Sequence, residues 1–247
     1  MQIFVINLER SIERREKMHR HLASLGLAAE FIPAIEGSRL AKGSIPPGTE
    51  PGLSPGEVGC YLSHVRSWQE IVDRRLSHAI VLEDDVSCSP SMIRVADEVA
   101  SLGLPIDAVR LSALRPIRGI LLTTLSGGEN LILPTKNPSG AQGYMVTFGG
   151  AKRLLATLSV PRCPVDTALD AYWMYGLRIP LITPSVVEEE GHLVSTIAGR
   201  FDFQHSNPLV QHIARVAQSQ RRKLTVFLMA RQLRRRMGSP AGGNGAE

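Results

Sequence analysis

The stretch His78–Pro90, HAIVLEDDVSCSP, decides the fold and raises the main functional question. Its apolar run, Ala79–Leu82, is of the short β-branched kind that forms a buried strand. The run ends in three consecutive acids, Glu83, Asp84 and Asp85. Adjacent carboxylates repel one another and resist desolvation, so this ending is costly unless something compensates it. The acids therefore predict a bound cation, a basic partner or an exposed turn at the end of this strand.

The segment before this stretch predicts a long helix that leads into the strand. Ser54–Glu57, SPGE, has Ser at the cap, Pro at the first helical position and Glu three residues after the cap. Apolar side chains then recur on one side of the expected helix: Val58, Tyr61, Leu62, Val65, Trp68, Val72 and Leu76. Helix followed by strand places the acids at the carboxyl end of a central strand, where open α/β sheets usually bind ligands.

The other segments also alternate between strand and helix patterns, which predicts an α/β fold. Near the N-terminus, a strand at Ile3–Leu8 precedes a helix, and a second short strand is expected at Glu30–Ile32. Residues 37–53 are rich in Gly, Pro and Ser and predict a loop. A helix is expected at 91–102, a strand at 107–113, and a hairpin formed by 119–125 and 130–135. A strand at 144–148 then ends in a Gly-Gly break, which is followed by one helix before residue 160 and one after it, and by a strand at 179–187.

Length and composition bound the class of protein. The chain has 247 residues, of which 43% are apolar, so it can bury a large core and is neither disordered nor fibrous. The apolar run near the N-terminus is too short for a signal peptide or a membrane span. Cys60, Cys88 and Cys163 are scattered, which predicts neither a disulfide framework nor a zinc site. A reducing, cytoplasmic setting is expected.

The net charge of +5 comes from the C-terminal part of the chain. Residues 203–246 carry eight Lys or Arg and no acid, whereas a nucleic-acid-binding protein would spread its bases over the folded face. The segment 211–237 predicts a basic amphipathic helix that either lies on an anionic membrane or packs on the domain with a solvated basic face. Its expected apolar arc contains Ile213, Val216, Ala217, Leu224, Phe227 and Leu228.

The three acids suit a hard divalent cation. In a strand, Glu83 and Asp85 point to one side and Asp84 to the other. Two carboxylates on one face can share Mn²⁺ or Mg²⁺, whose remaining positions phosphate oxygens can fill. A solvated turn is one alternative. A second is a Mg²⁺-dependent phosphatase of the haloacid dehalogenase type, with Glu83 in place of the nucleophilic Asp.

Seven segments, in order, resemble glycosyltransferase family 25, which contains bacterial lipooligosaccharide galactosyltransferases and, more distantly, collagen galactosyltransferases. The resemblance spans residues 1–197, and its specificity comes from the ordered set rather than from one motif. The segments are FVINLERSIERREKM, IPAIEG, LSPGEVGCYLSHVRSWQEIV, AIVLEDDV, SGAQGYMVTFGGAKRLL, PVDTALDAYW and PSVVEEEGHLVSTI.

The resemblance implies a fold and an activity. The fold is α/β: a GT-A-like, Rossmann-type mixed sheet flanked by helices, plus a C-terminal basic helix. The expected division is a glycosyltransferase domain at 1–202, to which the charge pattern of the chain adds a basic tail at 203–237 and a flexible end at 238–247. The activity is metal-dependent, inverting transfer of a hexose, expected to be galactose, from a UDP-sugar to a lipopolysaccharide-type glycan on the inner face of the cytoplasmic membrane. A non-catalytic protein that binds a sugar nucleotide or a glycan is the alternative.

The resemblance also assigns site residues by motif position. Asp85 and Glu83 are the expected ligands of Mn²⁺ or Mg²⁺. The general base is expected at Asp166, with Asp170 in reserve, although Asp166 suits a helix cap equally well. His192 completes the metal site or lies in an exposed turn. The residues expected around the sugar nucleotide are Asn7, Leu8, Arg14, Ser63, His64, Glu83, Asp84, Gly140, Gly143 and Tyr144.

Overall fold

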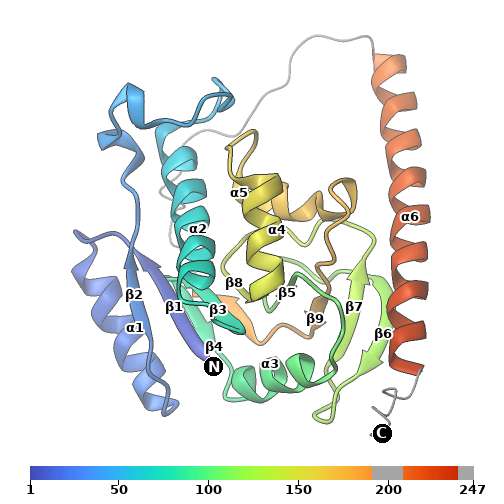
Figure 1. Cartoon of the computed structure of the whole chain (residues 1–247), viewed down its shortest axis with the longest axis horizontal. Coiled ribbons are helices and arrows are strands. Elements are labelled where there is room, and N and C mark those ends of the chain that lie inside the picture. Colours follow the sequence, from blue (N-terminus) through green and yellow to red (C-terminus); the bar gives the residue numbers. More distant parts are fainter. Residues whose placement is uncertain (191–207, 239–247) are drawn as a thin grey trace, which may run out of the picture.

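The computed structural model of the chain describes residues 1–190 and 208–238. The fold is built around an eight-stranded mixed sheet against which helices pack (Figure 1). The strands of this sheet are β1 (Gln2–Asn7), β2 (Glu30–Pro33), β3 (His78–Glu83), β5 (Ala108–Arg110), β6 (Gly119–Thr124), β7 (Asn130–Pro134), β8 (Gly143–Thr147) and β9 (Leu181–Thr183). A second, two-stranded sheet consists of β4 (Val86–Cys88) and β10 (Val187–Glu189). The helices are α1 (Ile12–Ser24), α2 (Pro55–Asp73), α3 (Met92–Ser101), α4 (Phe148–Leu158), α5 (Val165–Asp170) and α6 (Pro208–Gly238).

The order of the strands brings the ends of β1 and β3 together. The order is β2-β1-β3-β8-β5-β9-β7-β6, and β1 runs parallel to both of its neighbours. The chain leaves β1 toward β2 on one side and then crosses to β3 on the other, which makes this edge a topological switch point. Ile6 pairs with Glu83, so Asn7 and Asp84 leave the sheet side by side. Ligands of open α/β sheets bind at such a point.

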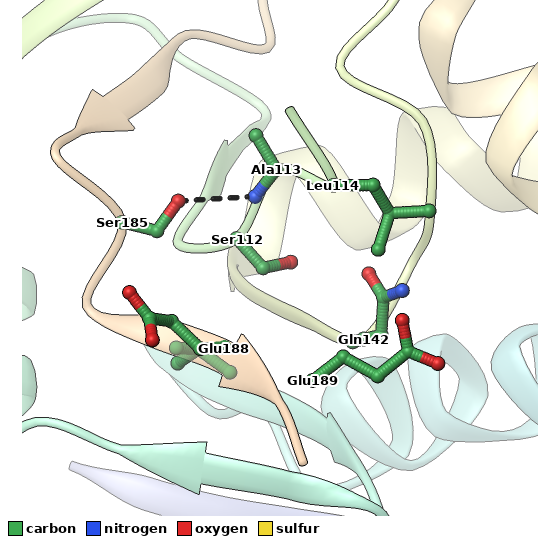
Figure 2. A pocket seen from close by; sticks show the side chains of 8 residues that line it. Ser112, Ala113, Leu114, Gln142, Ser185, Glu188 and Glu189 are labelled. Atoms are coloured by element: carbon green, nitrogen blue, oxygen red, sulfur yellow. Dashed lines mark hydrogen bonds between the residues drawn. The ribbon is translucent and has the colours of Figure 1, made fainter. Parts of the chain in front are cut away.

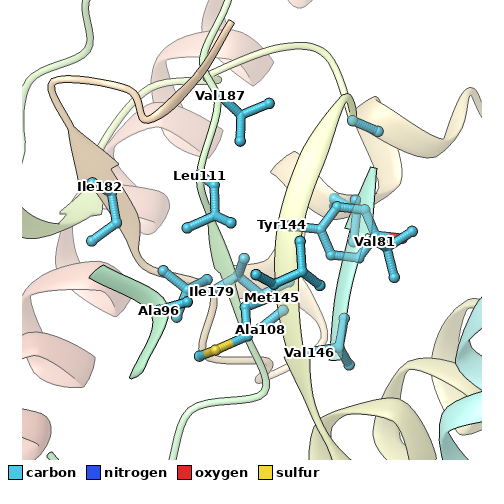
Figure 3. Packing of buried hydrophobic residues seen from close by; sticks show 14 of the residues in the cluster. Val81, Ala96, Ala108, Leu111, Tyr144, Met145, Val146, Ile179, Ile182 and Val187 are labelled. Carbon is cyan, nitrogen blue, oxygen red and sulfur yellow. The ribbon is translucent and has the colours of Figure 1, made fainter. Parts of the chain in front are cut away.

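The core explains why β3 reads as a continuous apolar run. Ala79–Leu82 is fully buried, so neither face of β3 reaches solvent; helix α2 packs on this strand, and β1 and β8 flank it in the sheet. Figure 3 shows the packing around β5 and β8, where Met145 and Val146 lie among aliphatic side chains from several other elements. Strands covered on both faces lose the alternation of apolar and polar residues.

Most of the predicted elements are confirmed, and α/β with a mixed sheet flanked by helices is the observed class. Ser54 and Glu57 form the predicted capping box of α2. The hairpin predicted over residues 119–135 is the antiparallel pair β6 and β7. Residues 37–53 are a loop with two 3₁₀ turns, at Gly37–Arg39 and Lys42–Ser44.

Two predictions about element boundaries are wrong. Gly149 and Gly150 do not break the chain between β8 and α4 but lie inside the first turn of α4, which begins at Phe148. The strand predicted at 179–187 is two strands, β9 and β10, with Pro184 between them. Proline has no backbone N–H for a strand ladder, so it favours this interruption.

The basic tail forms α6, which packs along β6 and β7 at one edge of the sheet (Figure 1). Val226, Ala230 and Leu233 are buried in the main core, and Arg234 bonds the carbonyl of Leu121. None of the helices within 1–190 and 208–238 combines the length and apolar character needed to cross a membrane. The opposite side of α6 carries three exposed apolar side chains: Leu224, Phe227 and Leu228, which are 62%, 55% and 48% exposed.

Two adjacent glycines in α4 predict opposite effects of the same substitution. A Cβ atom at Gly150 would lie 1.8 Å from the carbonyl oxygen of Asp107, whereas a Cβ atom at Gly149 would meet no atom within 4 Å. Gly150→Ala should therefore lower the free energy of unfolding by at least about 2 kcal/mol through overpacking. Gly149→Ala should raise it by roughly 0.5–1 kcal/mol because alanine favours the helix. Urea denaturation of both variants checks this pair, and a loss of stability in both would contradict it.

Candidate functional site

The switch point holds a compact cluster of polar side chains. Asn7 Nδ2 donates to Asp84 Oδ2 at 2.6 Å, and Asn7 is only 2% exposed. Arg14 Nη1 lies 3.2 Å from Asp84 Oδ1 and 3.4 Å from Asp85 Oδ2. Helix α1 follows β1 directly, which brings Arg14 over the end of β3. One guanidinium therefore faces two carboxylates.

The acids are not arranged as strand alternation predicted. We expected Glu83 and Asp85 on one side and Asp84 on the other, but β3 ends at Glu83 and the next two residues form a turn. Asp84 and Asp85 consequently reach the same nitrogen of Arg14. Glu83 instead lies 3.4 Å from His64 Nε2.

Asp85 is a partly buried carboxylate whose negative charge is incompletely compensated. Burial first, and then Glu83 and Asp84, raise the pKa of Asp85 to about 6, with Arg14 opposing the shift. Asp85 Oδ1 is buried and has no hydrogen-bond partner among the described residues. Glu189 adds to the negative field. An all-oxygen group with an unpaired buried carboxylate oxygen fits a hard cation such as Mn²⁺ or Mg²⁺.

Glu83 lies at the end of a chain of buried polar groups. Trp68 Nε1 donates to Tyr144 Oη at 2.9 Å, and Tyr144 Oη lies 2.7 Å from His64 Nδ1. Because the indole can only donate, the Tyr144 hydroxyl is free to donate to Nδ1, which leaves the proton of His64 on Nε2, facing Glu83. His64 is 1% exposed, so any effect on a bound ligand passes through Glu83.

Cys60 lies beside this chain and was not predicted as a site residue. One ligand atom from each of Cys60, His64 and Glu83 lies within 4.8 Å of the others. Burial, followed by the charges of Glu83 and Asp166, raises the pKa of the Cys60 thiol well above its usual range, so the thiol stays protonated near neutral pH. The i,i+4 spacing of Cys60 and His64 on α2 was the signal for this pair. A protonated thiol makes these three atoms a weak cation site.

The two candidate bases have different surroundings. Asp166 lies in the first turn of α5, where Pro164 and not Asp166 occupies the cap position, and its Oδ1 accepts from the Thr167 amide at 2.7 Å. Asp170 is 4% exposed and pairs with buried Arg110 at 3.2 Å. Its other oxygen accepts from the Ser139 amide at 3.1 Å. Asp170 is therefore held as half of an internal ion pair, whereas Asp166 is partly accessible.

Next to the acid cluster is a hollow of about 410 Å³ (Figure 2). Its polar lining includes Gln142, Glu188 and Glu189. The Glu83 amide donates to the Gln142 carbonyl at 2.9 Å, and the Glu190 amide donates to the Asp85 carbonyl at 2.9 Å. The hollow is thus joined to the three acids through the backbone.

Comparisons with known proteins show the family of this chain. Residues 1–114 match the family described as "Glycosyltransferase family 25 (LPS biosynthesis protein)". A glycosyltransferase 25 family member of Anopheles gambiae is 33% identical over 187 residues, which cover 68% of this chain and 31% of that protein. Procollagen galactosyltransferase 1 of Danio rerio is 30% identical over 190 residues, which cover 68% of this chain and 30% of that protein. The chain belongs to glycosyltransferase family 25.

Not every relative is described as active. Inactive glycosyltransferase 25 family member 3 of Homo sapiens is 29% identical over 185 residues, which cover 68% of this chain and 31% of that protein. The chain spans about a third of the length of the curated relatives that it matches. Family membership alone therefore leaves the activity of this chain to be tested.

The other residues predicted for the family 25 site make contacts within the fold. Leu8 follows β1, and its carbonyl accepts from the Ser11 amide. Ser63 is fully buried and joins the Ile35 amide to the Gly59 carbonyl, which is a contact within the fold. Three further predicted residues are buried: Gly140, which precedes β8, and Gly143 and Tyr144, which lie in β8. The predicted His192 lies outside the described residues.

The raised pKa of Asp85 predicts that the free energy of unfolding of this chain depends on pH. Between about pH 4 and pH 6 the folded protein holds the Asp85 proton more tightly than the unfolded chain does, so stability falls as pH rises through this window. In metal-free buffer at pH 7, Asp85→Asn should therefore raise the free energy of unfolding, by on the order of 1–3 kcal/mol. The gain should vanish near pH 4. Urea denaturation at the two pH values measures it.

Asp84→Asn is the matched control for this prediction. Asp84 accepts from Asn7 and Arg14, so its replacement should destabilise the protein at pH 7. Equal effects of the two substitutions would contradict the charge imbalance assigned to Asp85.

Proposed function

We propose that this chain transfers a hexosyl group from a UDP-sugar to a glycan hydroxyl, with a divalent cation bound at the end of β3. The observation that carries the proposal is the cluster of polar side chains at the switch point, where the Arg14 guanidinium contacts both Asp84 and Asp85. Family 25 membership supports the reaction class. The acids at this strand end have the oxygen donors that Mn²⁺ or Mg²⁺ requires.

Asp85 and Glu83 are the proposed metal ligands, with Asp84 as the carboxylate that holds Asn7 and Arg14 in place. The bound cation would neutralise negative charge on the departing diphosphate. Arg14 contacts the acids through one nitrogen, so its guanidinium keeps further donors for phosphate oxygens. His64 Nε2 lies 3.4 Å from a Glu83 oxygen and has no hydrogen-bond partner among the described residues, so it is available to bond the Glu83 carboxylate when the cation is bound.

Asp166 is the proposed general base, because inversion requires a group that accepts the proton of the attacking acceptor hydroxyl. The reserve candidate, Asp170, is buried in an ion pair with Arg110, whereas Asp166 is partly exposed and accepts from the Thr167 and Gly140 amides without a charged partner among the described residues.

The donor and acceptor are proposed from the relatives. Galactose is the proposed hexose, because the similar Danio rerio protein is named a procollagen galactosyltransferase. A lipopolysaccharide-type glycan is the proposed acceptor, because the matching family is described as an LPS biosynthesis protein. A non-catalytic nucleotide-binding protein is the second candidate, favoured by the relatives named inactive.

Nucleotide binding provides the first test. With Mn²⁺ present, UDP at about a hundred times its dissociation constant should stabilise the wild type by roughly 2.7 kcal/mol. Without Mn²⁺, or in Asp85→Ala, the stabilisation should be lost. Thermal unfolding with and without UDP measures this, and the Glu50→Gln variant, which changes an exposed acid of the loop, is the control that should respond like the wild type.

The outcomes separate the candidate functions. Stabilisation by UDP and Mn²⁺ together with transfer from UDP-galactose supports the proposal, and stabilisation without turnover supports the non-catalytic alternative. No response to UDP with Mn²⁺, combined with phosphate release from a simple ester, would favour a phosphatase and overturn the proposal.

We also propose that α6 holds the protein against the anionic inner face of the cytoplasmic membrane. Leu224, Phe227 and Leu228 face away from the core, and the exposed bases Arg231 and Arg235 lie on the same side of the helix. Apolar side chains flanked by bases suit a membrane surface, where each base contributes about 1 kcal/mol. Docking of this kind would bring the site close to a lipid-linked acceptor.

Vesicle binding tests this surface. The wild type should bind phosphatidylserine-containing vesicles in a salt-dependent way, and replacing Leu224, Phe227 and Leu228 together by Ser should weaken binding at least about tenfold, because apolar area is lost. Gln232→Ser on the same helix is the control and should bind like the wild type. Vesicle co-sedimentation measures both, and unchanged binding by the triple variant would contradict the proposal.

A further inference from the structure

The hollow beside the acid cluster has a chemistry of its own. It lies where the chain leaves β5, and the short strand β10 forms one wall (Figure 2). The pairing of β10 with β4 joins this wall to the turn that carries Asp84 and Asp85. Its lining residues are Ser112, Ala113, Leu114, Gln142, Ser185, Val187, Glu188 and Glu189.

Gln142 carries an unused hydrogen-bonding group into this hollow. The residue is 7% exposed, and its Oε1 atom has no partner within the described part of the chain. Gly140, with φ at +71°, makes room for the amide, because a Cβ atom there would lie 2.1 Å from Gln142 Oε1. A buried carbonyl oxygen without a partner costs about 1–3 kcal/mol, so a ligand that donates a hydrogen bond here recovers that cost.

The two charged side chains that line the hollow are both acidic. Glu188 and Glu189 are exposed side chains of β10, and no Lys or Arg is among the lining residues. The field of Glu189 also reaches Asp85. A phosphate or carboxylate group placed here would meet two carboxylates and no compensating cation, whereas hydroxyl groups could donate to both glutamates and to Gln142.

The apolar part of the lining suits the carbon face of a sugar ring. Ala113, Leu114 and Val187 line the hollow together with the polar side chains, as Figure 2 shows for the labelled Ala113 and Leu114. A ligand with hydroxyl groups at its edge and C–H groups on its face meets both surfaces. Pockets for small polar ligands commonly combine these features.

We infer that this hollow binds the sugar of the nucleotide donor and selects an uncharged or amine-bearing hexose over one that carries a carboxylate. The inference rests on the proposed function, since it takes the diphosphate to lie at Arg14 and the acids of β3. A sugar attached to that diphosphate has the hollow immediately beside it, through the backbone contacts of Glu83 with Gln142 and of Asp85 with Glu190. Glu188, Glu189 and Gln142 are the specificity-determining residues.

Binding measurements with three nucleotides test the inference. Isothermal titration with Mn²⁺ compares UDP, UDP-galactose and UDP-glucuronic acid, which differ in the presence and charge of the sugar. The wild type should bind UDP-galactose at least roughly tenfold more tightly than UDP-glucuronic acid, because like charges repel across the hollow. In the double variant Glu188→Gln, Glu189→Gln, this ratio should fall below about threefold, because the carboxylates that repel the charged sugar are gone.

A second variant tests the amide separately. Gln142→Met keeps the size of the side chain and removes its hydrogen-bonding groups, so affinity for UDP-galactose should fall about five- to tenfold with little change for UDP. Glu50→Gln is the charge-matched control, which should retain the ratio of the wild type. Unfolding curves of all variants establish that each is folded.

The results separate failure of this inference from failure of the proposed function. If UDP binds with Mn²⁺ but the wild type does not distinguish the two sugars, or the double variant keeps the full ratio, the hollow is not the sugar site and the inference alone is overturned. If UDP does not bind at all, the proposed function is overturned, and this inference falls with it.

Discussion

The rest of the site depends on an imbalance of charge at the end of β3. Arg14 faces both Asp84 and Asp85, and Asp85 keeps a buried oxygen without a partner. The topology creates the imbalance, because β1 and β3 end side by side and α1 places its arginine above them. A fold selected only for stability would replace one acid or add a base. Retaining the excess negative charge is useful where a cation binds.

The fold holds this imbalance in place through buried polar contacts. Trp68, Tyr144 and His64 form a chain that begins between α2 and β8 and ends at Glu83. Each of these side chains is nearly inaccessible to solvent, so the carboxylate at the strand end is supported from within the core. Positioning of this kind limits the rearrangement that a bound cation would require.

Local patterns in the sequence predicted the elements, but contacts between distant segments determined the site. The apolar run of β3 and the capping box at Ser54 depend on neighbouring residues, and both predictions are confirmed. The prediction that Glu83 and Asp85 share one side was wrong, because strand alternation stops where the backbone turns after Glu83, and Asp85 joins Asp84 at Arg14. The pairing of Arg110 with Asp170 and of β10 with β4 joins segments 60 or more residues apart, for which periodicity gives no signal. The family resemblance therefore suggested which residues belong to the site, but local sequence patterns could not predict which way their side chains point.

The distribution of charge gives the proposed site a direction. A UDP-sugar is anionic at its diphosphate and uncharged at a hexose, and the two neighbouring regions differ in the same way: Arg14 and a cation held by the acids would attract phosphate, whereas Glu188 and Glu189 repel it. The reverse orientation would place the diphosphate against two carboxylates. Because β10 is hydrogen-bonded to β4 beside Asp85, the two regions are held at a fixed separation. Repulsion on one side and attraction on the other can therefore orient the donor before any contact specific to one sugar is made.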